Sequence, residues 1–146
     1  MSLFEFGSGY STLFYSRFVN DVVSVEYDRA WFETIQKNAP INVSFCLQSN
    51  DVDGLYCRTI CNVNRQFDVV IVDGRDRVNC VKQSIPCLTP KGVILLDDSQ
   101  REEYAPGIEF AKSQGFKALD FEGLKPTGHD LHRSTVLYRS SNCFDL

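Results

Sequence analysis

Apolar residues in this chain gather in short runs, and two of the runs are continuous enough to indicate strands buried on both faces. Residues 67–72 are apolar apart from Asp68, and residues 93–96 are apolar throughout. A central strand of a parallel sheet shows this pattern because helices cover both of its faces. Shorter apolar or β-branched runs predict three more strands, at residues 3–6, 21–26 and 42–47.

The segments between these runs carry apolar residues at helical spacing. The pattern predicts helices at residues 10–18, 28–38, 76–88 and 99–114, and at most a short helix at 55–61. Asp28 is placed to cap the second helix, with Trp31 and Ile35 facing the sheet. Ser99 is placed to cap the last helix, which the Pro106-Gly107 pair can break or delay.

The end of the chain predicts a different arrangement. Residues 116–121 alternate between apolar and polar and predict a partly exposed strand. Residues 134–139 predict the last strand, and a polar loop at 123–133 separates the two. No helical segment lies between these two strands, so we expect an antiparallel pair. The whole pattern predicts an α/β fold. We expect a Rossmann-like open, mostly parallel twisted sheet of about seven strands, the last one antiparallel, with helices on both faces.

Length and composition narrow the class of protein. A chain of 146 residues with 43% hydrophobic and 23% charged residues fits one globular domain, residues 1–146. The net charge of −4 gives no basic surface for nucleic acid, and no run of about 18 apolar residues is present for a membrane. The six cysteines form no C-x-x-C pair, which favours reduced thiols in a cytoplasmic protein. The first strand begins so near residue 1 that we expect an upstream segment of the natural chain to be missing. The oligomeric state stays open.

Carboxylates stand at the end of every predicted parallel strand. A parallel sheet of this kind binds ligands beyond the carboxyl ends of its strands, near the point where the strand order reverses. Acidic side chains gathered at one edge repel each other unless a ligand, a cation or hydrogen bonds offset the charge. The strand ends are Glu5 with Gly7 and Gly9, Glu26, Asn50-Asp51, Asp73-Gly74 and Asp97-Asp98.

The first strand end also has the form of a nucleotide-type loop, because two glycines one residue apart stand between a strand and a helix. Glycine lets the chain turn sharply and lets a ligand contact bare backbone. Glu26 follows Gly7 by 19 residues, close to the spacing of about 20 at which an acidic residue meets ribose hydroxyls. A nicotinamide cofactor is disfavoured, because Thr12 replaces the third glycine and Glu5 would repel a pyrophosphate. A cofactor that carries an ammonium and a sulfonium would be favoured.

These residues lead to a family. Residues 5–12, Glu-Phe-Gly-Ser-Gly-Tyr-Ser-Thr, resemble the first motif of class I S-adenosylmethionine-dependent methyltransferases. Val25-Glu26-Tyr27 resembles the second motif, and residues 67–74 resemble the fourth. Residues 88–98 resemble the family's L-x-P-G-G turn and the strand after it, with Lys91 in place of a glycine. The resemblance covers nearly the whole chain, in the family's order and spacing.

The resemblance implies a site for S-adenosylmethionine. Glu5 would face the amino group of the methionine part, directly or through water. Glu26 would accept both ribose hydroxyls, and Tyr27 would lie against the adenine. Asn50 or Asp51 would hold the adenine amino edge, and Asp73 would line the methyl-transfer site. The implied cofactor-binding set is Glu5, Gly7, Ser8, Gly9, Glu26, Tyr27, Asn50, Asp51 and Asp73.

Catalysis and metal binding rest on fewer residues. Catechol-type and caffeoyl-CoA-type members of the family bind a divalent ion through an aspartate after the fourth strand and an Asp-Asn after the fifth. Asp73, Asp97 and Asp98 stand at these positions, with Asp98 in place of the asparagine, and three carboxylates suit magnesium, calcium or manganese. The alternative is that these aspartates serve as caps and as acceptors of backbone hydrogen bonds. His129 or His132, in the loop before the last strand, can act as a general base. We take Asp73, Asp97 and His129 as the catalytic candidates.

Three functions follow from these observations. The first is a methyltransferase that uses S-adenosylmethionine to methylate a hydroxyl of a small molecule or sugar. The second is a non-catalytic or truncated module that binds the same cofactor without an acceptor site. The third is a nicotinamide-dependent oxidoreductase, which Thr12 and Glu5 disfavour.

Overall fold

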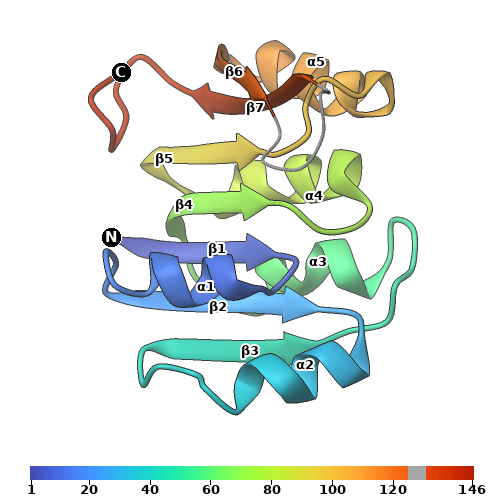
Figure 1. Ribbon diagram of the computed structural model, residues 1–146. Coiled ribbons are helices and arrows are strands. Elements are labelled where there is room, and N and C mark those ends of the chain that lie inside the picture. Colours follow the sequence, from blue (N-terminus) through green and yellow to red (C-terminus); the bar gives the residue numbers. More distant parts are fainter. Residues whose placement is uncertain (125–130) are drawn as a thin grey trace.

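The computed structural model describes residues 1–124 and 131–146 and contains one seven-stranded sheet (Figure 1). The strand order is β3-β2-β1-β4-β5-β7-β6. The strands are β1 (Ser2–Phe6), β2 (Asp21–Glu26), β3 (Val43–Leu47), β4 (Phe67–Val72), β5 (Leu88–Leu96), β6 (Lys117–Leu124) and β7 (Leu131–Tyr138). Strands β1 to β5 pair in parallel, and β7 runs antiparallel to both of its neighbours. The predicted fold class is therefore confirmed.

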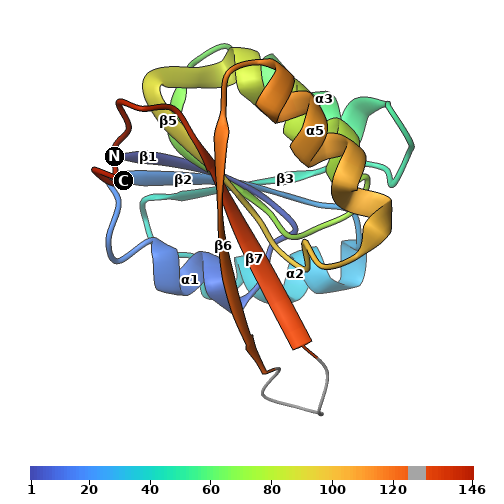
Figure 2. The same cartoon turned by 90° about the horizontal axis from the view of Figure 1, so that it is seen from above.

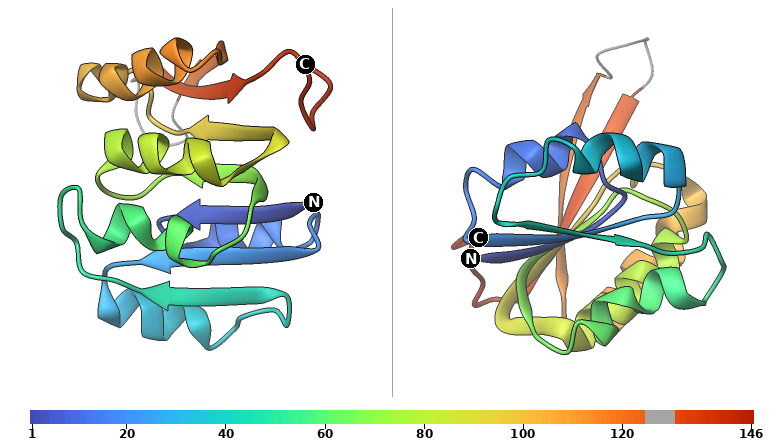
Figure 3. Two further views of the ribbon diagram at one scale, coloured as in Figure 1. Left: turned by 180° about the vertical axis from the view of Figure 1, so that it is seen from behind. Right: turned by 90° about the horizontal axis from the view of Figure 1, so that it is seen from below.

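The helices lie on both faces of the sheet. They are α1 (Tyr10–Tyr15), α2 (Arg29–Gln36), α3 (Leu55–Asn62), α4 (Arg77–Ser84) and α5 (Ala105–Ser113). Seen along the sheet, α1 and α2 lie on one face, and α3, α4 and α5 lie on the other (Figures 2 and 3). Within residues 1–124 and 131–146, no helix has both the length and the apolar composition needed to cross a bilayer.

Alternation along the central strands divides the core into two layers. Phe4 and Phe6 of β1 point to the same face as Phe67 and Tyr56, and all four side chains are fully buried there. Leu3 points to the opposite face, where it packs with residues such as Ile71. Burial of large apolar side chains on both faces of β1 and β4 stabilises the sheet and holds the ends of these strands in fixed positions.

The structure differs from the sequence pattern at several element ends. Strand β5 begins at Leu88 rather than at residue 93, because Leu88 already pairs with Phe67 before the register shifts. Helix α4 ends at Ser84, and Pro86 lies in a 3₁₀ turn that precedes β5. Residues 123–124 and 131–133 of the predicted loop belong to strands β6 and β7, and Leu124 pairs with Leu131.

The helix predicted to begin after Ser99 starts later. A 3₁₀ turn at Glu102–Tyr104 comes first, and α5 begins at Ala105 with Pro106 in its first turn, where proline is tolerated. Ser99 does not cap the helix. Its hydroxyl instead donates to the main-chain oxygen of Arg133, at 3.1 Å, and joins the end of β5 to β7.

Candidate functional site

A cleft of about 760 Å³ opens at the carboxyl ends of β1, β2 and β4. The strand order reverses between β1 and β4, so the cleft lies at the position where sheets of this type bind ligands. Its walls come from the turn after β1, the end of β2 with the start of α2, and the segment between β4 and α4. Arg101, Glu103 and Tyr104 close the side nearest β5.

The turn after β1 forms the floor of the cleft. Gly7 has φ +94°, and a Cβ atom there would lie 2.8 Å from the Cα atom of Gly74. Only glycine fits this position without strain, because the turns after β1 and β4 touch through their backbones. Gly9 is different. Its backbone is extended and a Cβ atom would meet nothing closer than 3.5 Å, so its conformation does not require glycine.

Glu26 is the carboxylate that the end of β2 presents to the cleft. Its side chain is buried and accepts hydrogen bonds from three main-chain N–H groups, those of Ser8 (3.1 Å), Tyr27 (2.8 Å) and Asp28 (2.8 Å). A carboxylate has about four acceptor positions, so about one stays open to a hydroxyl donor without any rearrangement. The three N–H groups fix the orientation of the carboxylate. Glu26 therefore combines a rigid position with remaining hydrogen-bonding capacity.

Aromatic side chains stand on either side of Glu26. The indole N–H of Trp31 donates to the main-chain oxygen of Ser8 at 2.8 Å, so the ring closes the cleft between α2 and the first turn. On the other side the Arg75 guanidinium lies 5.3 Å from the centre of the Tyr27 ring and donates to the Tyr27 hydroxyl at 3.1 Å. These flat groups make this end of the cleft suited to a planar ligand.

Glu5 lies behind the wall of the cleft and is not among its lining residues. It is fully buried and accepts hydrogen bonds from the hydroxyls of Ser11 (2.9 Å), Ser24 (2.7 Å) and Thr12. Burial is the largest influence and raises the pKa of Glu5 to about 7, although the three hydroxyls act in the opposite direction. Ser11 does line the cleft, so Glu5 acts on the cleft through one hydrogen bond.

Thr12, at the position of a third glycine, is explained by this arrangement. Its hydroxyl donates to Glu5 and accepts from the main-chain N–H of Gly9 at 2.9 Å. The side chain thus ties the turn after β1 to the buried carboxylate.

Asn50 and Asp51, predicted to meet an adenine, are not among the lining residues of the cleft. Asp51 accepts hydrogen bonds from the main-chain N–H groups of Leu55 (2.8 Å) and Tyr56 (3.0 Å) at the start of α3. Both bonds lower the pKa of the Asp51 carboxyl, and the bond from Tyr56 has the larger effect. Asn50 is exposed. In this structure Asp51 supports a helix end.

Asp73 and Arg77 form the wall toward β5. Arg77 is buried and donates to a carboxylate oxygen of Asp73 (3.0 Å) and to the main-chain oxygen of Asp97 (2.6 Å). Partial burial, and after it the negative charge of Asp97, raises the pKa of Asp73 to about 6. The Arg77 guanidinium acts in the opposite direction. The Asp73 carboxylate thus faces the cleft beside a fixed positive charge.

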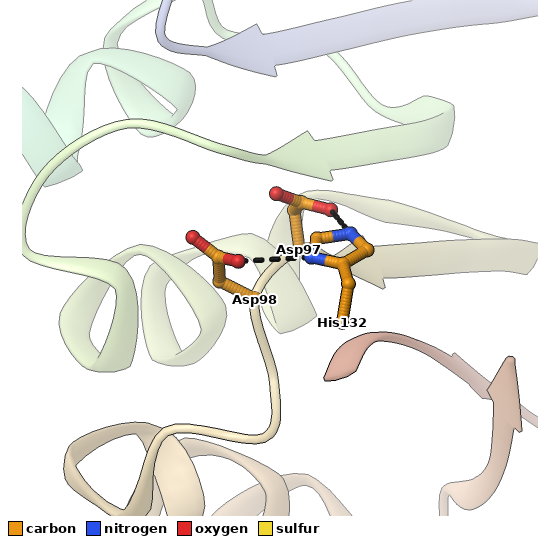
Figure 4. A group of neighbouring side chains, drawn as sticks. All are labelled: Asp97, Asp98 and His132. Carbon is orange, nitrogen blue, oxygen red and sulfur yellow. Dashed lines mark hydrogen bonds and ion pairs between the residues drawn. The ribbon is translucent and has the colours of Figure 1, made fainter. Parts of the chain in front are cut away.

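A second group lies next to this wall, where β5 ends (Figure 4). His132, at the start of β7, stands between Asp97 and Asp98, with each ring nitrogen 2.9 Å from one carboxylate oxygen. Arg101 contacts Asp98 at 3.0 Å, and Arg77 lies 3.8 Å from Asp97. The candidate ligand atoms of Asp97, Asp98 and His132 lie within 4.8 Å of one another.

The structure gives the acidic strand ends partners that the sequence prediction did not include. Asp73 pairs with Arg77, while Asp97 and Asp98 meet His132. His129, the other predicted histidine, lies outside the described residues. Among the described residues, the features that sequence reasoning missed are the cationic side chains between the carboxylates and the role of Trp31. A signal for the cationic side chains was present, since Arg75 and Arg77 lie one and three residues after the Asp73-Gly74 pair.

Comparison with solved structures shows which known fold this architecture matches. The chain superposes on an O-methyltransferase, TomG from Streptomyces achromogenes, with a TM-score of 0.73 and 15% identity over 94% of this chain and 73% of that one. It superposes on a precorrin-6y C5,15-methyltransferase from Geobacter metallireducens with a TM-score of 0.68 and 14% identity, covering 95% and 80% of the two chains. The chain has the class I methyltransferase fold.

A further structure with this fold is more similar in sequence. A methyltransferase-like protein from Silicibacter pomeroyi is 25% identical, with a TM-score of 0.61 over 93% of this chain and 78% of that one. No protein-family model matches the sequence, and no curated protein sequence matches it. The family resemblance inferred from the motifs is thus confirmed at the level of the fold. The cleft of this protein lies at the carboxyl edge of the sheet, where the strand order of this fold reverses.

Proposed function

We propose that this protein is a methyltransferase that binds S-adenosylmethionine in the cleft and methylates a hydroxyl group of a small molecule or sugar. The observation that carries the proposal is the Glu26 carboxylate, held rigidly at the end of β2 and facing a cleft of about 760 Å³. Support from the fold is independent of this residue, since one structural neighbour, TomG, is described as a complex with S-adenosylmethionine.

The donors and acceptors around the cleft fit this cofactor. Glu26 would bind the ribose hydroxyls, while the flat surfaces of Tyr27 and Trp31 would lie along the adenine. The bare backbone at Gly7 would leave room for the methionine part, with the Ser11 hydroxyl close by. Glu5 would act on this part through Ser11 rather than by direct contact, which modifies the role that the family resemblance implies.

Charge around the cleft favours a cation over a pyrophosphate. Five carboxylate side chains and three guanidinium groups line it, so the balance is negative. S-adenosylmethionine carries a sulfonium and an ammonium, which this balance attracts, whereas a dinucleotide carries a negatively charged pyrophosphate. The carboxylates are Glu26, Asp28, Asp73, Asp76 and Glu103, and the guanidiniums belong to Arg75, Arg77 and Arg101.

The acceptor would enter from the side of Arg101 and Tyr104. When bound, the cofactor supplies an electrophilic methyl group, and the protein must align an acceptor oxygen with it and remove a proton. Asp73 faces the cleft and is placed to hold that hydroxyl. Asp97 and His129 remain the other catalytic candidates. Asp97 does not line the cleft itself but contacts Arg77, which does.

The proposal also includes a divalent cation bound beside the cleft. Asp97, Asp98 and His132 are a donor set that suits manganese, because it combines carboxylate oxygens with an imidazole nitrogen. Each carboxylate already contacts His132 and an arginine, so an ion would displace His132 from between them. Asp73, the third carboxylate of the predicted metal site, accepts a hydrogen bond from Arg77 at 3.0 Å.

Two experiments test the proposed function. The first titrates the protein separately with S-adenosylhomocysteine and with NAD, and we expect binding of S-adenosylhomocysteine alone. The second offers radiolabelled S-adenosylmethionine with a panel of phenols, catechols and sugars, and we expect methyl transfer to a hydroxyl. Binding without transfer to any acceptor would favour the non-catalytic module, and binding of NAD alone would reject the proposal.

A further inference from the structure

Two cysteine sulfurs approach each other on the face of the sheet that carries α3, α4 and α5. Cys61 lies near the end of α3, and Cys87 lies in the 3₁₀ turn between α4 and β5. Their Sγ atoms are 3.3 Å apart, with the Cys87 thiol donating to Cys61, although the residues are 26 positions apart in the chain. Helices α3 and α4 lie side by side on this face, as the view from behind shows (Figure 3).

The pair differs from the other cysteines. All six thiols are free, and among the described residues no other two cysteine sulfurs are in hydrogen-bonding contact. Cys57 and Cys80 are fully buried, whereas Cys61 is only partly buried and Cys87 is 9% exposed. A reagent in solution can therefore reach Cys61, and Cys87 stands directly behind it.

We propose that Cys61 and Cys87 are a redox-modification site, at which a low-molecular-weight disulfide such as glutathione disulfide converts the two thiols to an intramolecular disulfide. The sulfur atoms must approach from 3.3 Å to about 2.05 Å. That movement is small for two side chains at the ends of short elements. The inference does not depend on the proposed methyl transfer.

The chemistry is a two-step exchange. Cys61 loses its proton to solvent, and its thiolate attacks one sulfur of glutathione disulfide, so a mixed disulfide forms and one glutathione thiolate leaves. Cys87 then loses its proton and attacks the Cys61 sulfur, which expels the second glutathione thiolate. Both leaving groups take up protons, and two electrons pass from the protein to the glutathione disulfide. Burial raises the pKa of Cys87 to about 12, which agrees with Cys61 reacting first.

The new bond would enclose a segment that matters for the cleft. Residues 61–87 include the whole of β4 and the cleft residues Asp73, Arg75 and Arg77. Cross-linking a loop of this length removes conformational freedom from the unfolded chain. We therefore expect the oxidised protein to unfold at a higher temperature, by about 5–10 °C.

The test treats the full chain with millimolar glutathione disulfide and analyses it by intact mass and by non-reducing peptide mapping. We expect a mass loss of about 2 Da and a cross-linked peptide pair containing Cys61 and Cys87, both reversed by dithiothreitol. Cys61→Ser and Cys87→Ser should each abolish the mass loss. Cys143→Ser, at a half-buried thiol bonded to the main-chain oxygen of Asp68, is the matched control and should behave as wild type.

The wild-type peptide map decides the question even if a serine variant folds poorly. Folded wild type, checked by circular dichroism, that yields no Cys61–Cys87 peptide would overturn the proposal. A mass loss that persists in Cys61→Ser, or a cross-link to any other cysteine in place of this one, would overturn it as well. Binding of S-adenosylhomocysteine, measured separately, reports on the proposed function and not on this site.

Discussion

The buried carboxyl group of Glu5 should make the stability of the protein fall as the pH rises. Its pKa is raised from 4.5 to about 7 in the folded state, mainly by burial. The folded state therefore binds more protons than the unfolded state between these two pH values, and the free energy of unfolding decreases across that window. Full stability is present below pH 4.5 and is lost as the pH passes about 7.

The size of the effect follows from the same two values. The two pKa values differ by about 2.5, and a pKa difference of one corresponds to about 1.4 kcal/mol, so the ionised group costs about 3.5 kcal/mol at a pH well above 7. Glu5→Gln removes the ionisation and keeps the shape and one acceptor oxygen for the surrounding hydroxyls. At pH 5 we expect the free energy of unfolding of the variant to equal that of wild type or to be slightly lower. At pH 8 the difference should have shifted by about 3 kcal/mol in favour of the variant.

Urea denaturation followed by circular dichroism, at several pH values from about 5 to 8.5, measures this difference. Other titrating groups contribute to both proteins, so subtraction isolates Glu5. Glu33→Gln, on the exposed face of α2, is the control and should show the pH dependence of wild type. Parallel curves for wild type and Glu5→Gln would refute the reasoning, because Glu5 would then titrate as it does in the unfolded chain.

Two more predictions concern the turn and the acidic group after β5. Gly7→Ala should lower the free energy of unfolding by about 1–3 kcal/mol, because φ is +94° and the added methyl would lie 2.8 Å from Gly74. Gly9→Ala should lower the free energy of unfolding by less than about 1 kcal/mol. If urea denaturation gave the same loss for both variants, Gly7 and Gly9 would not differ in the way their backbone geometry indicates. Millimolar manganese should raise the melting temperature of wild type with S-adenosylhomocysteine present, and should not do so in the double variant Asp97→Asn/Asp98→Asn. No shift in wild type would leave these aspartates as partners of His132 and the arginines.

Much of the fold and part of the site could be predicted from the sequence because they depend on patterns within single elements. Continuous apolar runs identify central strands, and the carboxyl ends of parallel strands meet at one edge. Gly7, Glu26 and Asp73 therefore had to lie near one another, as the structure shows. Alternation along β1 does place Glu5 on the opposite face from Phe4 and Phe6, but only packing reveals that three hydroxyls enclose it.

The remaining contacts depend on how separate elements come together. His132 reaches Asp97 and Asp98 because β7 pairs with β5 in a register that aligns Leu96 with Thr135. The sequence contains no local signal for that register, since helix α5 and strand β6 lie between β5 and β7 in the chain. Arg77 likewise reaches Asp97 only because the start of α4 lies beside the end of β5. These pairings determine which side chains contact each carboxylate, and they add His132 and Arg77 to the neighbourhood of the predicted metal group.

The most direct test of the central claim is calorimetric titration of S-adenosylhomocysteine into wild type and Glu26→Ala, with Glu33→Ala as the control on the exposed face of α2. Removing a charged acceptor of ribose hydroxyls should cost about 1–3 kcal/mol, or roughly 5- to 150-fold in affinity. Circular dichroism would check that the variant keeps its fold despite the lost bonds to Ser8, Tyr27 and Asp28. The account predicts binding to wild type and Glu33→Ala and weaker binding to folded Glu26→Ala. Equal affinity in all three proteins, or no binding to wild type, would contradict it.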